Sequence, residues 1–227
     1  MIDIPNQFSK NFGVMNDKDF LRLQSINVLI VGVGGLGGNV SNLLTRLGVK
    51  NLSLVDYDTF DESNLNRQLF SNKNTIGKYK VDILKKELLD INNDVNIKNH
   101  TDKIQNIDPD ILLKFDYIID AVDNPKTKIY ISELGSKLDI PVLHGACAGW
   151  YGQIGWILPG CNLIKDTYQD NEAGLESELH NPSFTPAATA SYMVSEFLKM
   201  IQGSDQTTIN KLLLIDLLSN SVIKTNK

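Results

Sequence analysis

Short apolar runs rich in β-branched residues alternate along this chain with longer segments whose apolar residues recur at helical spacing. Residues 26–31 form a run that stops at a glycine cluster, and residues 115–122 form another strongly apolar run. Such runs are typical of strands buried on both faces of a parallel sheet. Between them, residues 77–91 repeat apolar side chains along one helical face. The pattern therefore predicts strands and helices in alternation.

The order of these elements predicts an α/β fold, with a Rossmann-like, mostly parallel sheet, helices on both faces and an antiparallel C-terminal extension. The expected strands are 26–31, 51–56, 95–98 (an edge strand), 115–122, 141–144, 150–158, 212–216 and 221–224. The expected helices are 16–25, 36–47, 77–91, 126–137 and 185–202. For the last helix, Thr185 is predicted as the N-cap and Pro186 as the first helical residue.

The chain has 227 residues, a length that allows one large domain. No internal repeat interrupts the pattern, so we expect a single domain over residues 1–227 that begins with a polar arm at about 1–15. Residues 159–184 show little periodicity and are expected to form a long mobile loop, of the kind that is usually functional inside a compact domain.

Charge and cysteine content exclude several classes of protein. The net charge is −5, so no broad basic face is available for nucleic acid or an anionic membrane. The two cysteines, Cys147 and Cys161, form no CxxC pair, and no structural zinc is expected. There is no secretory signal and no apolar run of membrane-spanning length. These features predict a cytoplasmic, enzyme-sized domain.

A glycine motif after the first strand indicates nucleotide binding. Gly32-x-Gly34-x-x-Gly37 follows the predicted strand and opens a helix, where glycines let a phosphate approach the backbone and free N–H groups receive it. Asp56 ends the next strand, at the position where an acid accepts hydrogen bonds from a ribose. The motif alone leaves a nicotinamide dinucleotide, a flavin dinucleotide and ATP open.

Polar residues that suit a triphosphate follow the second strand. Residues 63–68 (Ser-Asn-Leu-Asn-Arg-Gln) set Arg67, one of only three arginines, among amides that can bind phosphate oxygens. Lys80 lies near the start of the next predicted helix, a second phosphate-binding position. A dehydrogenase would have no use for Arg67 and Lys80 at these positions, so they favour ATP over a nicotinamide dinucleotide as the ligand. Taken singly, Arg67 could be a surface ion pair and Lys80 a solvated helix residue.

A further carboxylate stands at the end of a central strand. Asp123 and Asn124 follow the strand at 115–122, at the sheet edge where ligands of open α/β sheets bind. A carboxylate there suits a magnesium ion held between protein and phosphates. The simpler interpretation of Asp123 is a helix cap.

Together these motifs resemble the ThiF/MoeB/HesA family, the bacterial relatives of the ubiquitin-activating enzymes. The glycine loop, Asp56-x-Asp58, residues 63–68, residues 77–80 (Gly-Lys-Tyr-Lys) and Asp123-Asn124 carry the resemblance over about residues 8–203. It implies ATP-dependent adenylylation of the C-terminal glycine carboxylate of a ubiquitin-like sulfur-carrier protein, in thiamine, molybdopterin or related sulfur transfer, by a homodimer.

The resemblance also implies roles for single residues. Asp56 takes the ribose, Asn64, Arg67 and Lys80 contact the phosphates, and Asp123 binds Mg²⁺, which makes Arg67, Lys80 and Asp123 the expected catalytic residues. The whole expected ATP site is Gly32, Gly34, Gly35, Gly37, Asp56, Asp58, Asn64, Arg67, Gln68, Lys80, Asp123 and Asn124.

Some family features are altered or missing. Relatives carry an N-terminal arginine that reaches the partner subunit's ATP, and here only Lys10 is available to replace it. The family's arginine after Asp-Asn is Lys128. The paired CxxC zinc site is absent, and residues 162–184 lack the cysteine that some members use for sulfur transfer.

These departures leave two alternatives. One is a carrier-binding partner subunit with weak or no catalytic activity, and a more remote one is an NAD(P)-dependent oxidoreductase. Three residues that resemble chemical groups have simpler expected roles: His144 as a packed strand-end residue, Cys147 as a small core residue and Cys161 as an ordinary free thiol.

Overall fold

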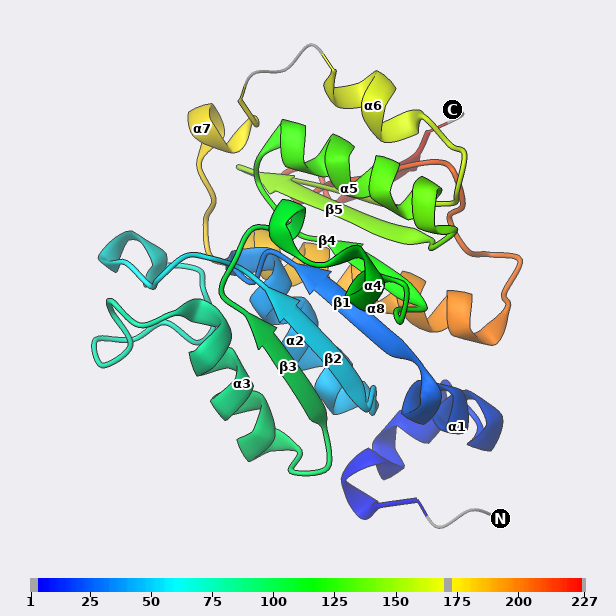
Figure 1. Cartoon of the computed structure of the whole chain (residues 1–227). Coiled ribbons are helices and arrows are strands. Elements are labelled where there is room, and N and C mark those ends of the chain that lie inside the picture. The colour runs from blue at the N-terminus through cyan, green and yellow to red at the C-terminus, as the bar shows by residue number, and fades with distance from the viewer. Residues whose placement is uncertain (1–3, 170–172, 226–227) are drawn as a thin grey trace.

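The computed structural model describes residues 4–169 and 173–225, and its centre is a single twisted sheet (Figure 1). In the described residues the sheet has eight strands in the order β3-β2-β1-β4-β5-β6-β7-β8. Neighbouring strands from β3 to β5 pair in parallel, whereas β5 to β8 pair antiparallel. The strands are β1 (Asn27–Val31), β2 (Asn51–Val55), β3 (Asn96–His100), β4 (Tyr117–Asp120), β5 (Val142–Ala148), β6 (Tyr151–Ile157), β7 (Leu213–Asp216) and β8 (Ser221–Lys224). The expected fold class is confirmed.

Helices cover both faces of the sheet. One face packs against α1 (Asp17–Ser25), α2 (Gly35–Leu47), α3 (Lys80–Ile91) and α8 (Phe184–Gln202). The other packs against α4 (Pro109–Leu112), α5 (Pro125–Leu138) and α6 (Leu163–Tyr168). The remaining short elements are α7 (Glu176–Leu179) and the 3₁₀ turns η1 (Asn6–Gly13), η2 (Glu62–Asn64) and η3 (Ile104–Asn106).

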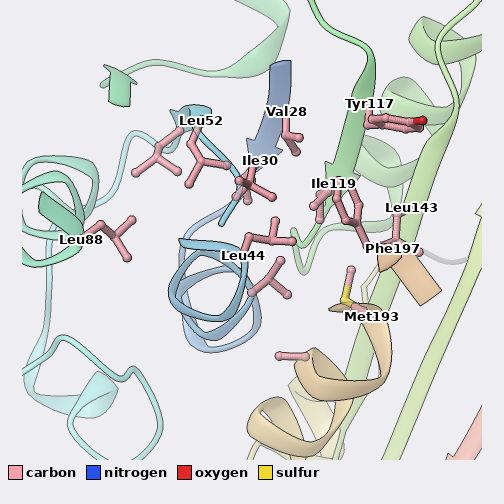
Figure 2. Close-up of a cluster of buried hydrophobic side chains, with 14 of the residues drawn as sticks. Val28, Ile30, Leu44, Leu52, Leu88, Tyr117, Ile119, Leu143, Met193 and Phe197 are labelled. Carbon is pink, nitrogen blue, oxygen red and sulfur yellow. The ribbon is translucent and has the colours of Figure 1, made fainter. Parts of the chain in front are cut away.

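Strand β1 shows why a continuous apolar run predicts a central parallel strand. Val28 and Ile30 point to the α2/α8 face, and Leu29 and Val31 point to the α5 face. Successive residues of the strand therefore enter the two cores in turn. All four are buried. Figure 2 shows Val28 and Ile30 on β1 in the larger core, with Leu44 of α2 near Ile30.

Two predicted helix starts are wrong. The helix predicted from Gly77 begins at Lys80, because Gly77 has a positive φ of 79° and belongs to a turn. Helix α8 has Ser183, not Thr185, at its N-cap. The Thr185 hydroxyl instead donates to the Gly149 carbonyl at 2.5 Å, which joins α8 to the β5–β6 hairpin.

The segment 159–184 is more structured than its sequence suggests. Helix α6 packs against α5 through the buried Ile164, and α7 forms a second short helix. Residues 170–172 of the expected loop lie outside the described residues. The interpretation as one long loop is therefore wrong for α6 and α7, while its mobility stays a prediction.

The N-terminal arm also packs against helices α1 and α2 of the same chain. In η1 the buried Phe8 packs against Phe20 of α1 with ring centroids 5.3 Å apart, and Asn11 donates to the Arg46 carbonyl at the end of α2 at 2.9 Å. Lys10 is exposed. Among the described helices, none has both the length and the apolar composition that a bilayer crossing requires.

Candidate nucleotide-binding site

A cavity of about 470 Å³ opens at the carboxyl ends of β1, β2 and β4, the edge where open α/β sheets bind ligands. The structure brings most of the expected ATP-site residues to its lining: Gly32, Gly34, Gly35, Asp56, Asp58, Arg67, Gln68, Lys80, Asp123 and Asn124. Gly37 and Asn64 do not line it. The buried Asn64 side chain instead accepts a hydrogen bond from the Asp61 amide and stabilises the η2 turn.

The glycine loop is shaped by close approach of two backbones. Gly32 has a φ of 82°, and a Cβ there would lie 2.8 Å from the Ala121 carbonyl oxygen just beyond β4. A Cβ at Gly37 would overlap the Gly32 carbonyl oxygen itself. Gly34 is the N-cap of α2, and no side chain occupies the amides of its first turn. The loop thus presents free backbone N–H groups and the positive end of the helix dipole to the cavity.

Asp56 holds the loop as well as facing the cavity. Its Oδ2 accepts from the Val33 amide at 2.8 Å and its Oδ1 from the Asp58 amide at 2.9 Å. Burial raises the pKa of this carboxyl, and the Lys80 charge and the two amides act in the opposite direction. A carboxylate can accept about four hydrogen bonds, so Asp56 keeps capacity for ligand hydroxyls.

Lys80 is a buried cation at the start of α3. Its ammonium forms an ion pair with the half-exposed Asp58 at 3.0 Å, and its amide donates to the Asp58 carbonyl. This pair fixes the ammonium at the cavity wall. It is thus not the solvated helix residue of the simpler interpretation.

Arg67 and Gln68 line the cavity from the segment that follows η2. Arg67 donates from Nη1 to the Ser63 carbonyl and to Asn66 Oδ1, both at 2.9 Å, and its stem lies beside Gly35. It forms none of the ion pairs found in the described chain. The buried Gln68 has an Oε1 without a hydrogen-bond partner among the described residues. A buried acceptor left unpaired in a cavity wall fits a site completed by a polar ligand.

Asp123 and Asn124 differ in function although they are adjacent. Asn124 is the N-cap of α5, where its Oδ1 accepts from the Thr127 amide at 3.0 Å. Asp123 is exposed at the cavity. The described residues contain no group of three or more metal-binding side chains. A lone carboxylate fits Mg²⁺, which takes one or two protein carboxylates and completes its shell with phosphates and water.

Two walls of the cavity were not predicted. One follows β3 and consists of residues 102–105, where the Lys103 ammonium lies 5.3 Å from the centre of the Tyr57 ring. The other includes Cys147 of β5 and Asn181, whose carbonyl accepts from Asn66 at 2.9 Å. The first wall could have been found, because the carboxyl end of β3 lies at the same sheet edge as those of β1 and β2.

Beneath the cavity lies a buried cluster that sequence analysis missed. Asp120, at the end of β4, is 3.5 Å from the Lys128 ammonium and 2.7 Å from Nδ1 of His144. Burial alone would raise the pKa of Asp120, but the Lys128 charge and the His144 hydrogen bond hold it below its ordinary value. Burial lowers the pKa of His144. His144 is therefore a packed, hydrogen-bonded strand residue, as expected.

The sheet, the glycine loop and the cavity define an α/β protein with a ligand site at the carboxyl ends of its parallel strands. A protein-family model described as the ThiF family matches residues 8–227, so this chain belongs to the ThiF family. The family resemblance stated from the motifs is confirmed.

Individual relatives give the same picture. The chain is 31% identical over 156 residues to SUMO-activating enzyme subunit 2 of Dictyostelium discoideum, covering 68% of this chain and 24% of that protein. It is 31% identical over 194 residues to a probable molybdopterin-synthase adenylyltransferase of Porphyra purpurea, covering 80% of this chain and 50% of that one. The chain thus spans half or less of these two relatives.

Solved structures show a close likeness of fold. E. coli MccB, solved with ATP, superposes with a TM-score of 0.80 over 98% of this chain and 72% of that chain, at 22% identity.

Proposed function

We propose that this protein is an adenylyltransferase that uses ATP to activate the C-terminal glycine carboxylate of a ubiquitin-like sulfur-carrier protein. One observation carries the proposal: the cavity brings a glycine loop at a helix N-terminus together with Arg67, Lys80 and the exposed carboxylate of Asp123 at one sheet edge. Family membership and the adenylyltransferase name of a relative support it.

The chemistry suits these residues because the nucleophile is a carboxylate that is already ionised at neutral pH. No general base is needed, so catalysis consists of in-line positioning and stabilisation of charge as pyrophosphate leaves the α-phosphorus. We infer that Asp56 binds the ribose and that Arg67 and Lys80 bind the phosphates. The buried Gln68 amide would complete its hydrogen bonds on the nucleotide.

Asp123 would hold Mg²⁺, which neutralises phosphate charge when bound. Its carboxylate is exposed at the cavity and makes no hydrogen bond or ion pair with the other described residues, so it is available for this task. Asn64 could contact a phosphate only through Nδ2, because its Oδ1 accepts the Asp61 amide in the η2 turn and the residue does not line the cavity.

The carrier, the pathway and the assembly belong to the same proposal. We infer a homodimer in the cytoplasm, made of single-domain subunits, and a carrier of the thiamine, molybdopterin or a related sulfur-transfer pathway. The small residues on the partly open face of α8, among them Ala187, Ala188 and Ser191, suit close packing against a second copy.

The test is the intact mass of each candidate carrier after incubation with the protein, ATP and Mg²⁺. The proposal expects a carrier that gains one adenylyl group, and a carrier truncated by its terminal glycine that gains none. The alternative, a partner subunit without catalytic activity, expects a stable complex with unmodified carrier. An oxidoreductase would bind NAD(P) in preference to ATP.

A further inference from the structure

A line of hydrogen bonds, buried at Lys128, Asp120 and His144 and part-buried at Tyr168, connects the nucleotide cavity with α6. Lys128 lines the cavity, and its ammonium donates to the Gly145 carbonyl at 2.9 Å while lying 3.5 Å from Asp120. Asp120 bonds His144, and Nε2 of His144 lies 3.3 Å from the hydroxyl of Tyr168, at the end of α6. The Tyr168 hydroxyl is also 3.3 Å from Oε1 of Gln153 on β6.

The protons on this line cannot satisfy every acceptor when His144 is neutral. Asp120 is an acceptor only, so Nδ1 of His144 carries a proton and Nε2 is left as an acceptor. The Tyr168 hydroxyl has one proton and faces at least two acceptors in the described part of the chain, Nε2 of His144 and Oε1 of Gln153. It can donate to only one of them. A second proton on His144 removes the conflict, because Nε2–H then donates to Tyr168 and Tyr168 donates to Gln153.

The charges around His144 come from two neighbouring elements. Within residues 4–169 and 173–225, Asp120 of β4 and Lys128 of α5 are the charged groups that act on it. Tyr168 is the ionisable group that faces it from α6, and β6 places Gly155 opposite it. With His144 neutral, the charges of Asp120 and Lys128 cancel. With His144 protonated the cluster carries one positive charge, in the wall of a cavity that would receive a polyanion.

We propose that binding of a nucleotide triphosphate is accompanied by uptake of one proton from solvent at His144, while Tyr168 changes from a donor to an acceptor and turns its own proton to Gln153. This inference rests on the proposed function, because it takes the ligand of the cavity to be ATP. It makes the contact between α6 and the sheet depend on occupancy of the cavity. His144 and Tyr168 act through Lys128 and Asp120, and touch no substrate.

The direct test is NMR of the full chain with ¹⁵N-labelled histidine, titrated with pH with and without saturating α,β-methylene ATP. The chain has three histidines, and the variants His100→Gln and His180→Gln assign the signals. The proposal expects a neutral Nδ1–H tautomer in the free protein and a higher pKa for His144 in the complex. An unchanged or lower pKa in the complex would overturn it, as would a ring that stays neutral throughout both titrations.

A pair of hydroxyl deletions tests the part played by Tyr168. In Tyr168→Phe the imidazolium loses its acceptor, so the pKa increase on binding the analogue should shrink. Tyr130→Phe removes a hydroxyl from a half-buried tyrosine of α5 and should keep the increase in full. Equal increases in both variants would contradict the switch at Tyr168.

Calorimetry of analogue binding in buffers of different ionisation enthalpy gives an independent measure. The wild type should take up about one proton more per site than His144→Gln near neutral pH, once the analogue's own protonation is subtracted. If the analogue does not bind at all, the proposed function fails. If it binds with equal proton uptake in both proteins, the proposed function stands and this inference fails.

Discussion

The floor of the cavity and the segment 159–184 at its rim are built in different ways. The floor consists of strand ends and of the cluster beneath them, Asp120, Lys128 and His144, of which Lys128 lines the cavity. Each of the three is at most 2% exposed. The rim segment is anchored at α6, but beyond it Leu175 and Leu179 are 66% and 46% exposed. A segment with few buried contacts opens at low free-energy cost, whereas the floor cannot move without disrupting the core.

This difference suggests a division of labour. The strand ends of the floor position the glycine loop, Asp56 and Asp123, which must be placed accurately for chemistry on a phosphate. The rim contributes Asn181 to the cavity and meets the 63–68 loop through the bond from Asn66. We infer that the rim closes over a carrier tail and limits hydrolysis of the acyl-adenylate by water.

The largest expected effect comes from breaking the buried ion pair of the floor. Lys128→Met leaves Asp120 buried without its cation, and we expect unfolding free energy to fall by about 3–5 kcal/mol. The control, Lys165→Met, breaks an exposed pair with Glu133 (N–O distance 3.1 Å) and should cost at most about 1 kcal/mol. Equal losses of unfolding free energy for the two variants in denaturant titrations would contradict the greater contribution of the buried pair to stability.

The same pair predicts a dependence of stability on pH. The folded pKa of Asp120 lies below its unfolded value, so its contribution is present above the unfolded pKa and is lost as pH falls through the folded one. Denaturant titrations should therefore show wild type losing stability toward acid pH more steeply than Asp120→Asn.

Arg67→Ala should have the next largest effect, this time on activity. If Arg67 stabilises charge on the leaving pyrophosphate, the decrease in kcat/KM should correspond to a loss of about 2–4 kcal/mol of transition-state stabilisation. The free energy of unfolding should change little. Arg46→Ala, on the exposed side of α2, is the matched control. A variant that keeps more than about half of the wild-type rate contradicts the assignment.

Asp123→Ala should change how activity depends on the metal. Turnover should decrease, and more Mg²⁺ should be needed to reach half of the maximum, because the exposed carboxylate is the expected protein ligand. Asp56→Ala should instead weaken ATP binding. Identical Mg²⁺ titration curves for wild type and Asp123→Ala would exclude the metal role.

The smallest expected effect is on hydrogen exchange in the rim of the wild-type protein. Amides of residues 173–184 should exchange hydrogen faster than those of β1 in the free protein, and adding carrier and ATP should slow them. Protection equal to that of β1 before carrier is added would make the rim a rigid part of the structure.

Periodicity and motif order were enough to predict the strands, most helices and the sheet edge that carries the site. They failed where residues that act together are distant in sequence. The Asn64 phosphate contact stays a prediction: its Oδ1 accepts the Asp61 amide in the local η2 turn, and the residue does not line the cavity. The floor cluster joins residues 120, 128 and 144, and its proximity follows only from pairing of β4 with β5. Helix α6 was missed because one buried residue, Ile164, gives too little periodicity.

Carrier-dependent exchange of pyrophosphate into ATP tests the central claim most directly. The protein, Mg²⁺, ATP and labelled pyrophosphate are combined with each candidate carrier, and label in ATP is measured. The proposed adenylylation predicts exchange with one carrier that has an intact C-terminal glycine, and none with the same carrier lacking that residue. Tight binding of carrier and ATP without exchange, for every carrier tried, would contradict it.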